Sequence, residues 1–244
     1  MNKVPGILDG QSAVIVGGSS GIGKATAAQL LSLGASVTIV SRSKERLASA
    51  QIELGPTIRT QAMDCANESE AAAFFESLDT LDHLVISIAG SAALGPFSEV
   101  PVQGYRETFD GKFWPYLIAM YHGTKLLAEE GTLTIVTGAS AIAATPSAAS
   151  LGAVNGALEG MIKTLAVELA PRRVNAVSPG LTDTEAWDRI PEDIRVSMYA
   201  QSAADTPVGR IGQPGDVANA VAACIANGFL TGLVLPCDGG KRLA

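Results

Sequence analysis

The sequence contains few cysteines and few histidines, and this scarcity restricts the chemistry open to it. Its three cysteines, Cys65, Cys224 and Cys237, are an odd number without close spacing, which predicts reduced thiols and a cytoplasmic location. The two histidines, His83 and His122, form no cluster with the cysteines. We therefore expect no metal site.

Long apolar runs and an excess of positive charge are also missing. No unbroken apolar run reaches the roughly 18 residues of a membrane-spanning helix, and the start, M-N-K-V-P-G, lacks the apolar segment of a signal peptide. The formal net charge of −7 argues against nucleic acid or an anionic membrane as a partner. With 47% hydrophobic residues in 244 positions, the chain predicts one globular domain, residues 1–244, without linkers or repeats.

The clearest motif lies at residues 14–23 and reads V-I-V-G-G-S-S-G-I-G. Apolar β-branched residues enter a Gly/Ser turn, which opens an alanine-rich helical segment. Glycines at 17, 21 and 23 permit a tight turn, close approach of a ligand and close packing of helix on strand. Because the N-terminus of a helix favours an anion, we expect a dinucleotide pyrophosphate here. A glycine-rich turn without a ligand is the alternative.

Strand-like and helix-like segments alternate along the rest of the chain. Further strands are expected at 36–41, 57–63, 84–88, 133–136, 174–177 and 232–235, and helices at 44–54, 68–78, 101–130, 147–170, 185–201 and 216–226. The strands are apolar along their whole length, which suits a parallel sheet covered on both faces. We predict an α/β fold, a single doubly wound Rossmann domain with a mostly parallel seven-stranded sheet and helices on both faces.

The end of the second expected strand indicates which dinucleotide is preferred. An NAD-binding fold places an acidic residue about 20 positions after the glycines to bind the ribose 2′-hydroxyl, but residues 40–44 contain no acid. Arg42 and Lys44 would instead suit a 2′-phosphate. We therefore expect NADP(H) as the cofactor, with a solvated basic helix start as the alternative.

Several stretches resemble the short-chain dehydrogenases/reductases, and together they span essentially the whole chain. They are G-G-S-S-G-I-G, I-A-G at 88–90, L-A-V-E-L-A at 165–170, R-V-N-A-V-S-P-G-L-T-D-T at 173–184, P-V-G-R-I-G-Q-P-G-D-V-A from 207 and T-G-L-V-L-P-C-D-G-G at 231–240. The resemblance implies an NADP(H)-binding oxidoreductase acting on a carbonyl or alcohol. The cofactor-binding residues are then expected to be Gly17, Ser19, Ser20, Gly21, Ile22, Gly23, Ser41, Arg42, Asp64, Cys65, Ala89, Gly90, Pro179, Gly180, Thr182 and Thr184.

The catalytic positions do not match that family. Its reductases use a Tyr and a Lys at i and i+4 on the long helix after the fifth strand, with a Ser 13 residues before the Tyr and an Asn on an earlier helix. Alignment on L-A-V-E-L-A places Leu151 at the Tyr position, Asn155 at the Lys position and Gly138 at the Ser position. The Asn position falls near Lys112. The catalytic residues therefore stay unknown; Lys112 is a candidate to supply a proton or hold a ribose, although we expect an ordinary surface lysine.

Two other features could be mistaken for the missing site. Tyr121 and Lys125 form a Tyr-x-x-x-Lys motif, but on the wrong helix for the family, where we expect them to face solvent or a neighbouring subunit. Ser140 is the hydroxyl nearest to Gly138, but it need not face the cleft.

Three functions remain open. The first is an NADP(H)-dependent oxidoreductase with an unusual proton donor, from Lys112, from residues 185–210 or from water. The second is a non-catalytic NADP(H)-binding sensor or scaffold. The third is a structural protein that has lost the cofactor, which the intact glycine motif disfavours. Residues 185–210 are expected to form a lid-like insertion that sets specificity for an unknown small-molecule substrate.

We also expect a homodimer or homotetramer. The helix around residues 114–127 and the helix carrying Gly152, Gly156 and Gly160 resemble the two that pair between subunits in the family. Packing against the chain's own sheet is the alternative use of the glycine row.

Overall fold

The computed structural model of the protein describes residues 6–243 and contains the expected parallel sheet. Its strands run in the order β3-β2-β1-β4-β5-β6-β7, and every neighbouring pair is parallel. The expectation about a signal peptide concerns the first residues of the chain, and residues 1–5 lie outside the described part. The strands are β1 Ser12–Val16, β2 Ser36–Ser41, β3 Arg59–Ala62, β4 Leu81–Ile86, β5 Leu127–Val136, β6 Arg173–Pro179 and β7 Val234–Cys237.

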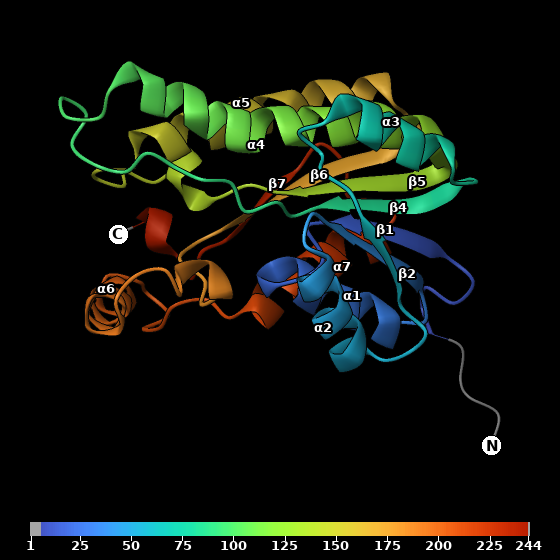
Figure 1. Ribbon diagram of the computed structural model, residues 1–244, viewed down its shortest axis with the longest axis horizontal. Helices are drawn as coiled ribbons and strands as arrows, with labels where there is room; N and C mark the ends of the chain where they lie inside the picture. The colour runs from blue at the N-terminus through green and yellow to red at the C-terminus, as the bar shows by residue number, and fades with distance from the viewer. Residues whose placement is uncertain (1–5, 244) are drawn as a thin grey trace.

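Helices cover both faces of this sheet, as the apolar strands predict (Figure 1). One layer contains α3, α4 and α5, and the opposite layer contains α1, α2 and α7. The remaining helix, α6, lies apart from both layers at one end of the molecule. The helices are α1 Gly21–Ser32, α2 Lys44–Leu54, α3 Glu68–Glu76, α4 Val102–Gly123, α5 Ala149–Glu168, α6 Glu192–Ala204 and α7 Pro214–Ala226. Among residues 6–243, no helix combines the length and the apolar character that crossing a membrane requires.

The strand order explains where a ligand can bind. β1 lies between β2 and β4, so the chain leaves β1 in one direction to build β2 and β3 and returns to build β4 on the other side. At such a switch point the connecting loops diverge and leave a crevice at the carboxyl ends of the strands. The glycine-rich turn at residues 17–21 lies at this end of β1.

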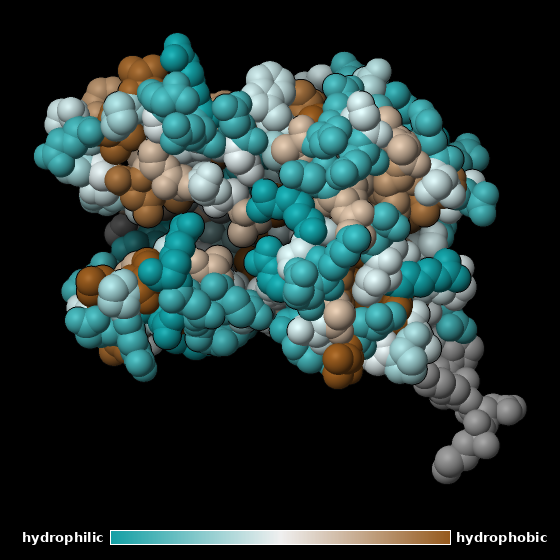
Figure 2. Space-filling view, viewed as in Figure 1, coloured by the Kyte–Doolittle hydropathy of each residue, from teal (hydrophilic) through white to brown (hydrophobic). Residues whose placement is uncertain are grey.

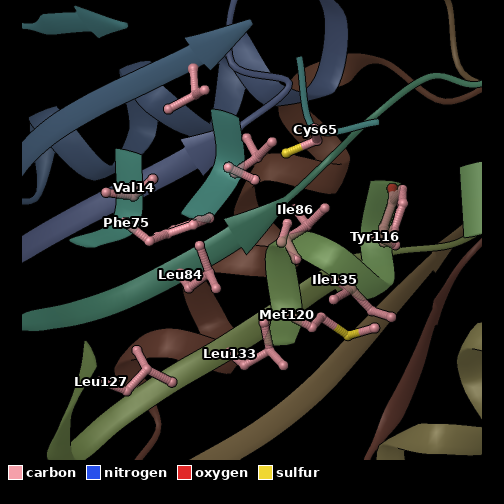
Figure 3. Close-up of a cluster of buried hydrophobic side chains, with 14 of the residues drawn as sticks. Val14, Cys65, Phe75, Leu84, Ile86, Tyr116, Met120, Leu127, Leu133 and Ile135 are labelled. Atoms are coloured by element: carbon pink, nitrogen blue, oxygen red, sulfur yellow. The ribbon is translucent and has the colours of Figure 1, made fainter. Parts of the chain in front are cut away.

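Buried side chains pack into two apolar layers, one on each face of the sheet. The larger layer joins β4 and β5 to α3, α4 and α5, and includes the fully buried Phe75 and Tyr116 (Figure 3). Gly123, the last residue of α4, packs directly against this layer, and a β-carbon there would lie 2.5 Å from Leu84 Cδ2. A glycine at this position thus lets the end of α4 approach β4 closely.

Several predicted boundaries are wrong in ways that have a physical reason. The helix expected at 101–130 ends at Gly123, and β5 begins at Leu127 rather than at residue 133. Glu129 and Glu130 are exposed near the start of this strand, and their charge interrupts the apolar pattern from which the strand was predicted. The helix expected at 185–201 is a short turn, Glu185–Trp187, followed by α6, because Pro191 starts a new helix. The last strand lies at Val234–Cys237, two residues later than expected.

His83 connects three segments in the interior of the sheet. Its Nδ1 lies 2.9 Å from Thr132 Oγ1 in β5, and its Nε2 lies 2.7 Å from Gln11 Oε1. The amide oxygen of Gln11 can only accept, which assigns the proton of a neutral ring to Nε2. Burial lowers the pKa of His83 to about 4, a change that Asp82 opposes and Arg173 favours.

We therefore expect His83 to make the protein sensitive to mild acid. In the unfolded chain a histidine takes up its proton near pH 6.5, whereas the folded protein resists protonation down to about pH 4. The stabilisation is complete above pH 6.5 and falls by about 3 kcal/mol as the pH drops to 4. Urea unfolding of the parent and of His83→Gln at both pH values measures this difference. Equal losses of stability in the two proteins would contradict the assignment.

Candidate active site

A cavity of about 410 Å³ opens at the carboxyl ends of the strands, where the order reverses. It extends from the glycine-rich turn, across the ends of β1 and β4, to α4, the start of α5 and the turn at residues 184–189. In the space-filling view a notch separates the part that carries α6 from the part above it (Figure 2). The cavity therefore lies where the doubly wound fold is expected to bind a ligand.

Most of the residues expected to bind a cofactor lie around this cavity. Gly23 is the exception, because it packs against the backbone oxygen of Gly17 and fixes α1 close to β1. Arg46 also lines the cavity, whereas Lys44 does not. Arg46 was not among the residues expected from the sequence, although its spacing of four residues from Arg42 points to it. The expected residues that line the cavity are Gly17, Ser19, Ser20, Gly21, Ile22, Ser41, Arg42, Asp64, Cys65, Ala89, Gly90, Pro179, Gly180, Thr182 and Thr184.

The glycine-rich end of the cavity attracts anions. The backbone N–H of Gly21, in the first turn of α1, donates to Glu185 Oε2 at 2.8 Å. Glu185 Oε1 also lies 3.3 Å from Lys24 Nζ. Although burial raises the pKa of Glu185, hydrogen bonds from backbone N–H groups and from Lys24 hold it below its usual value. A carboxylate of the chain itself thus occupies a donor suited to a phosphate.

The edge of the cavity beyond β2 carries two guanidinium groups. Arg42 and Arg46 are exposed, and neither forms an ion pair with any residue among 6–243. Ser41 and Ser19 lie beside them and are joined by a hydrogen bond of 2.8 Å between their hydroxyls. The two planar guanidinium groups at this edge can therefore donate hydrogen bonds to an anionic group.

Lys112 is the most unusual group in the site. The expectation of a surface lysine is wrong, because its residue is 8% exposed and its amine lies inside the protein. Lys112 Nζ donates to the backbone oxygen of Thr137 at 3.0 Å and to Asn155 Oδ1 at 2.8 Å. Burial lowers the pKa of Lys112 to about 8, and the charge of Glu159 opposes this change. A residue that lines the cavity thus carries a buried amine whose pKa lies well below its usual value.

The other family positions surround this amine without supplying a proton. Leu151 is half-buried and lines the cavity, so the tyrosine position offers only methyl groups. Asn155 is 3% exposed, accepts from Lys112 and donates from Nδ2 to Ser140 Oγ at 3.0 Å. Neither Gly138 nor Ser140 is among the residues that line the cavity. The structure therefore brings the four positions together, with the lysine on α4 and the asparagine on α5.

The remaining phenol and thiol of the cavity are poor proton donors. Tyr116 donates to the backbone oxygen of Val136 at 2.6 Å, and burial raises its pKa far above the usual range. Burial also raises the pKa of the Cys65 thiol to about 12. Tyr121 and Lys125 lie elsewhere, with the lysine amine 3.8 Å from the centre of the exposed tyrosine ring. Within residues 6–243, Lys112 is the amine positioned in this cavity.

Comparison with known proteins agrees with this geometry. A family model described as enoyl-(acyl carrier protein) reductase matches residues 16–242. An uncharacterized oxidoreductase of Methylorubrum extorquens is 34% identical, and the match covers 96% of this chain and 99% of the relative. A small-chain dehydrogenase solved in complex with NADPH is 35% identical, with a TM-score of 0.85 over 97% of this chain and 100% of that one.

A second solved structure is relevant to the altered site. It is a short-chain oxidoreductase from Pseudomonas aeruginosa PAO1 described as containing an atypical catalytic center. It is 27% identical, with a TM-score of 0.86 over 96% of this chain and 97% of that chain.

The fold and the glycine-lined crevice first define the class, a dinucleotide-binding α/β protein of the Rossmann type. The match over nearly the whole chain then identifies the family. The chain belongs to the short-chain dehydrogenase/reductase family of oxidoreductases.

Asn155 packs against position 138, and we expect this contact to allow only a glycine there without a loss of stability. A β-carbon at residue 138 would lie 2.7 Å from Asn155 Nδ2, so Gly138→Ala should lower the free energy of unfolding by about 1–3 kcal/mol. In an Asn155→Ala background the same substitution should cost much less, because the obstructing amide is gone. Urea unfolding of the four proteins of this double-mutant cycle measures the coupling. Additive losses would show that the contact is unimportant.

Proposed function

We propose that the protein is an NADP(H)-dependent oxidoreductase that interconverts a carbonyl and an alcohol, with Lys112 as its proton donor and acceptor. The observation that carries this proposal is Lys112, which lines the cavity and whose buried amine is held by Thr137 and Asn155. Membership in the family supports the class of reaction. The related structure in complex with NADPH supports the cofactor.

The residues of the cavity fit a phosphorylated dinucleotide. The N-terminus of α1 already holds a carboxylate, that of Glu185, through the N–H of Gly21, and would hold a pyrophosphate in the same place. Arg42 and Arg46 would bind a 2′-phosphate through charge-assisted hydrogen bonds. When bound, the cofactor supplies the hydride for reduction or accepts it in oxidation.

Lys112 can supply the proton that accompanies the hydride. As an ammonium it has three N–H groups, of which Thr137 and Asn155 accept two. The third can be donated to the carbonyl oxygen while the hydride reaches the carbonyl carbon, which yields the alcohol and a neutral amine. The amine then regains a proton from solvent. General acid catalysis works best when the donor titrates near the operating pH, and burial brings the pKa of Lys112 down to about 8.

The neighbouring residues orient the Lys112 amine and limit access of water to it. Asn155 and Thr137 fix the position of Nζ by hydrogen bonds. Leu151 supplies an apolar wall of the cavity, which strengthens charge–dipole interactions inside it.

The second candidate is a non-catalytic NADP(H)-binding sensor or scaffold. Leu151 favours it, because the position that carries the family's proton donor has none. Binding of NADPH without turnover of any carbonyl or alcohol would support this candidate over the enzyme.

We further propose that the protein is cytoplasmic and assembles as a homodimer or homotetramer. Trp114 and Tyr121 are exposed on α4. Gly156 and Gly160 have open space where a β-carbon would stand on α5. α4 therefore offers large exposed aromatic side chains to a second copy of the chain, and α5 offers a surface without side chains at its two glycines. Residues 185–210 are proposed to control access of the substrate.

Replacing Lys112 tests the proposed reaction. In the parent, kcat/KM for reduction should be constant at low pH and fall as the pH rises through about 8, because the amine loses its proton. Lys112→Met should reduce kcat/KM by roughly 10²–10⁴-fold. Stopped-flow or steady-state loss of NADPH absorbance with a panel of ketones, aldehydes and quinones provides the measurement. Lys125→Met, at the surface, serves as the matched control, and full activity of Lys112→Met would refute the assignment.

Replacing Arg42 tests the preference for a 2′-phosphate. The parent should bind NADPH about 10- to 100-fold more tightly than NADH, the worth of one charge-assisted bidentate contact. Arg42→Asp should erase or invert this ratio, and Arg46→Asp should reduce it. Lys44→Asp should leave it unchanged, because Lys44 does not line the cavity. Fluorescence titration measures both affinities. Equal affinities of the parent for NADPH and NADH would contradict the assignment of Arg42 to the 2′-phosphate.

A further inference from the structure

Glu159 lies on α5, one helical turn after Asn155, with its carboxylate among hydroxyl groups. Its Oε1 accepts from Thr137 Oγ1 at 2.7 Å and from Ser178 Oγ at 3.0 Å. Thr137 follows the last residue of β5, and Ser178 belongs to β6. Glu159 therefore joins α5 to the carboxyl ends of two neighbouring strands.

Thr137 connects this carboxylate to the Lys112 amine. Its hydroxyl donates to Glu159, while its backbone oxygen accepts from Lys112 Nζ at 3.0 Å. Asn155, the second acceptor of the amine, lies on the same helix as Glu159 at a spacing of four residues. Residues at this spacing share one face of a helix. One face of α5 thus carries the Asn155 amide, which binds Lys112, and the Glu159 carboxylate, which binds Thr137, the second residue that holds Lys112.

The charges around Lys112 are unevenly distributed. On its own helix, α4, Tyr116 is a phenol that stays neutral, and Asp110 lines the cavity. The ends of β5 and β6 contribute only the hydroxyls of Thr137 and Ser178. On α5, Glu159 is the carboxylate whose charge favours the protonated form of the amine. Burial acts in the opposite direction, since it disfavours a charged amine.

We propose that Glu159 is a positioning residue that keeps the Lys112 amine protonated and holds the Thr137 carbonyl against it. The proposal deepens the proposed function, because a general acid must carry its proton when the substrate binds. Glu159 does not line the main cavity; it lines a separate groove of about 610 Å³ with Lys163 and residues 232–234. It therefore acts on the reaction through Lys112 and Thr137 and not by touching the cofactor or substrate.

An NMR titration of the full-length protein with ¹³Cε-labelled lysine tests this role without requiring turnover. The Lys112 signal is assigned as the one that Lys112→Met removes. Its midpoint should lie near pH 8 in the parent and about one unit lower in Glu159→Gln, which removes the charge but preserves an acceptor. Glu168→Gln, an exposed carboxylate on the same helix, is the matched control and should leave the midpoint unchanged.

Two further variants separate an electrostatic role from a merely structural one. Glu159→Asp retains the charge and should keep the midpoint close to that of the parent. Glu159→Ala, beside an open groove, should show the same downward shift as the glutamine variant, and it replaces that variant if glutamine prevents folding. An unchanged Lys112 midpoint in a folded variant without the carboxylate would overturn the proposal.

The outcome is independent of whether the protein is an enzyme. If NADPH is never oxidised by any carbonyl but the Lys112 midpoint still falls in Glu159→Gln, the proposed function fails and the role of Glu159 stands. If the parent reduces a carbonyl and its kinetic midpoint near pH 8 is unaffected by Glu159→Gln, the proposed function stands and Glu159 is not its positioning residue.

Discussion

A buried amine needs hydrogen-bond acceptors, and this requirement shapes the carboxyl end of the sheet. Leaving such a group unpaired would cost several kcal/mol. Lys112 meets the requirement by bringing the end of β5 and the middle of α5 to one point on α4. The loop after β4 has to pass close by, and Gly90 allows this because a β-carbon there would lie 2.8 Å from Lys112 Cβ. The positions of α4, α5, the end of β5 and the loop after β4 therefore depend on one another through the contacts of Lys112.

The same contact explains how the family's site can change without collapsing. The resemblance places an asparagine on α4 and a lysine on α5, whereas this chain has Lys112 on α4 and Asn155 on α5. The two side chains are hydrogen-bonded to each other, so in this chain one amine–amide pair spans the α4–α5 interface. Gly138 completes the arrangement, since a larger residue would obstruct the Asn155 amide. The altered positions form one consistent set rather than independent losses.

The sequence was sufficient to predict the features that depend on local pattern. The glycine-rich turn, the apolar parallel strands and the doubly wound order all follow from residue spacing. It was insufficient where tertiary contacts decide. Lys112 lies in F-D-G-K-F-W, a stretch of mixed aromatic and polar residues, and its burial depends on partners 25 and 43 residues away. Likewise, the start of β5 contains Glu129 and Glu130, whose charge conceals a strand that the sheet imposes through pairing with β4.

The carboxylate of Glu185 at the start of α1 has a consequence for any anionic ligand. Two anions cannot share the N–H of Gly21, so an incoming phosphate has to replace a group that is already stabilised by that N–H and by Lys24. Binding is then an exchange of one anion for another, and the measured affinity is the difference between two favourable contacts. Glu185 belongs to the turn that leads to α6, so an anion that competes for this N–H competes with a contact that ties that turn to α1. The internal carboxylate therefore links the glycine-rich turn directly to the segment that leads into α6.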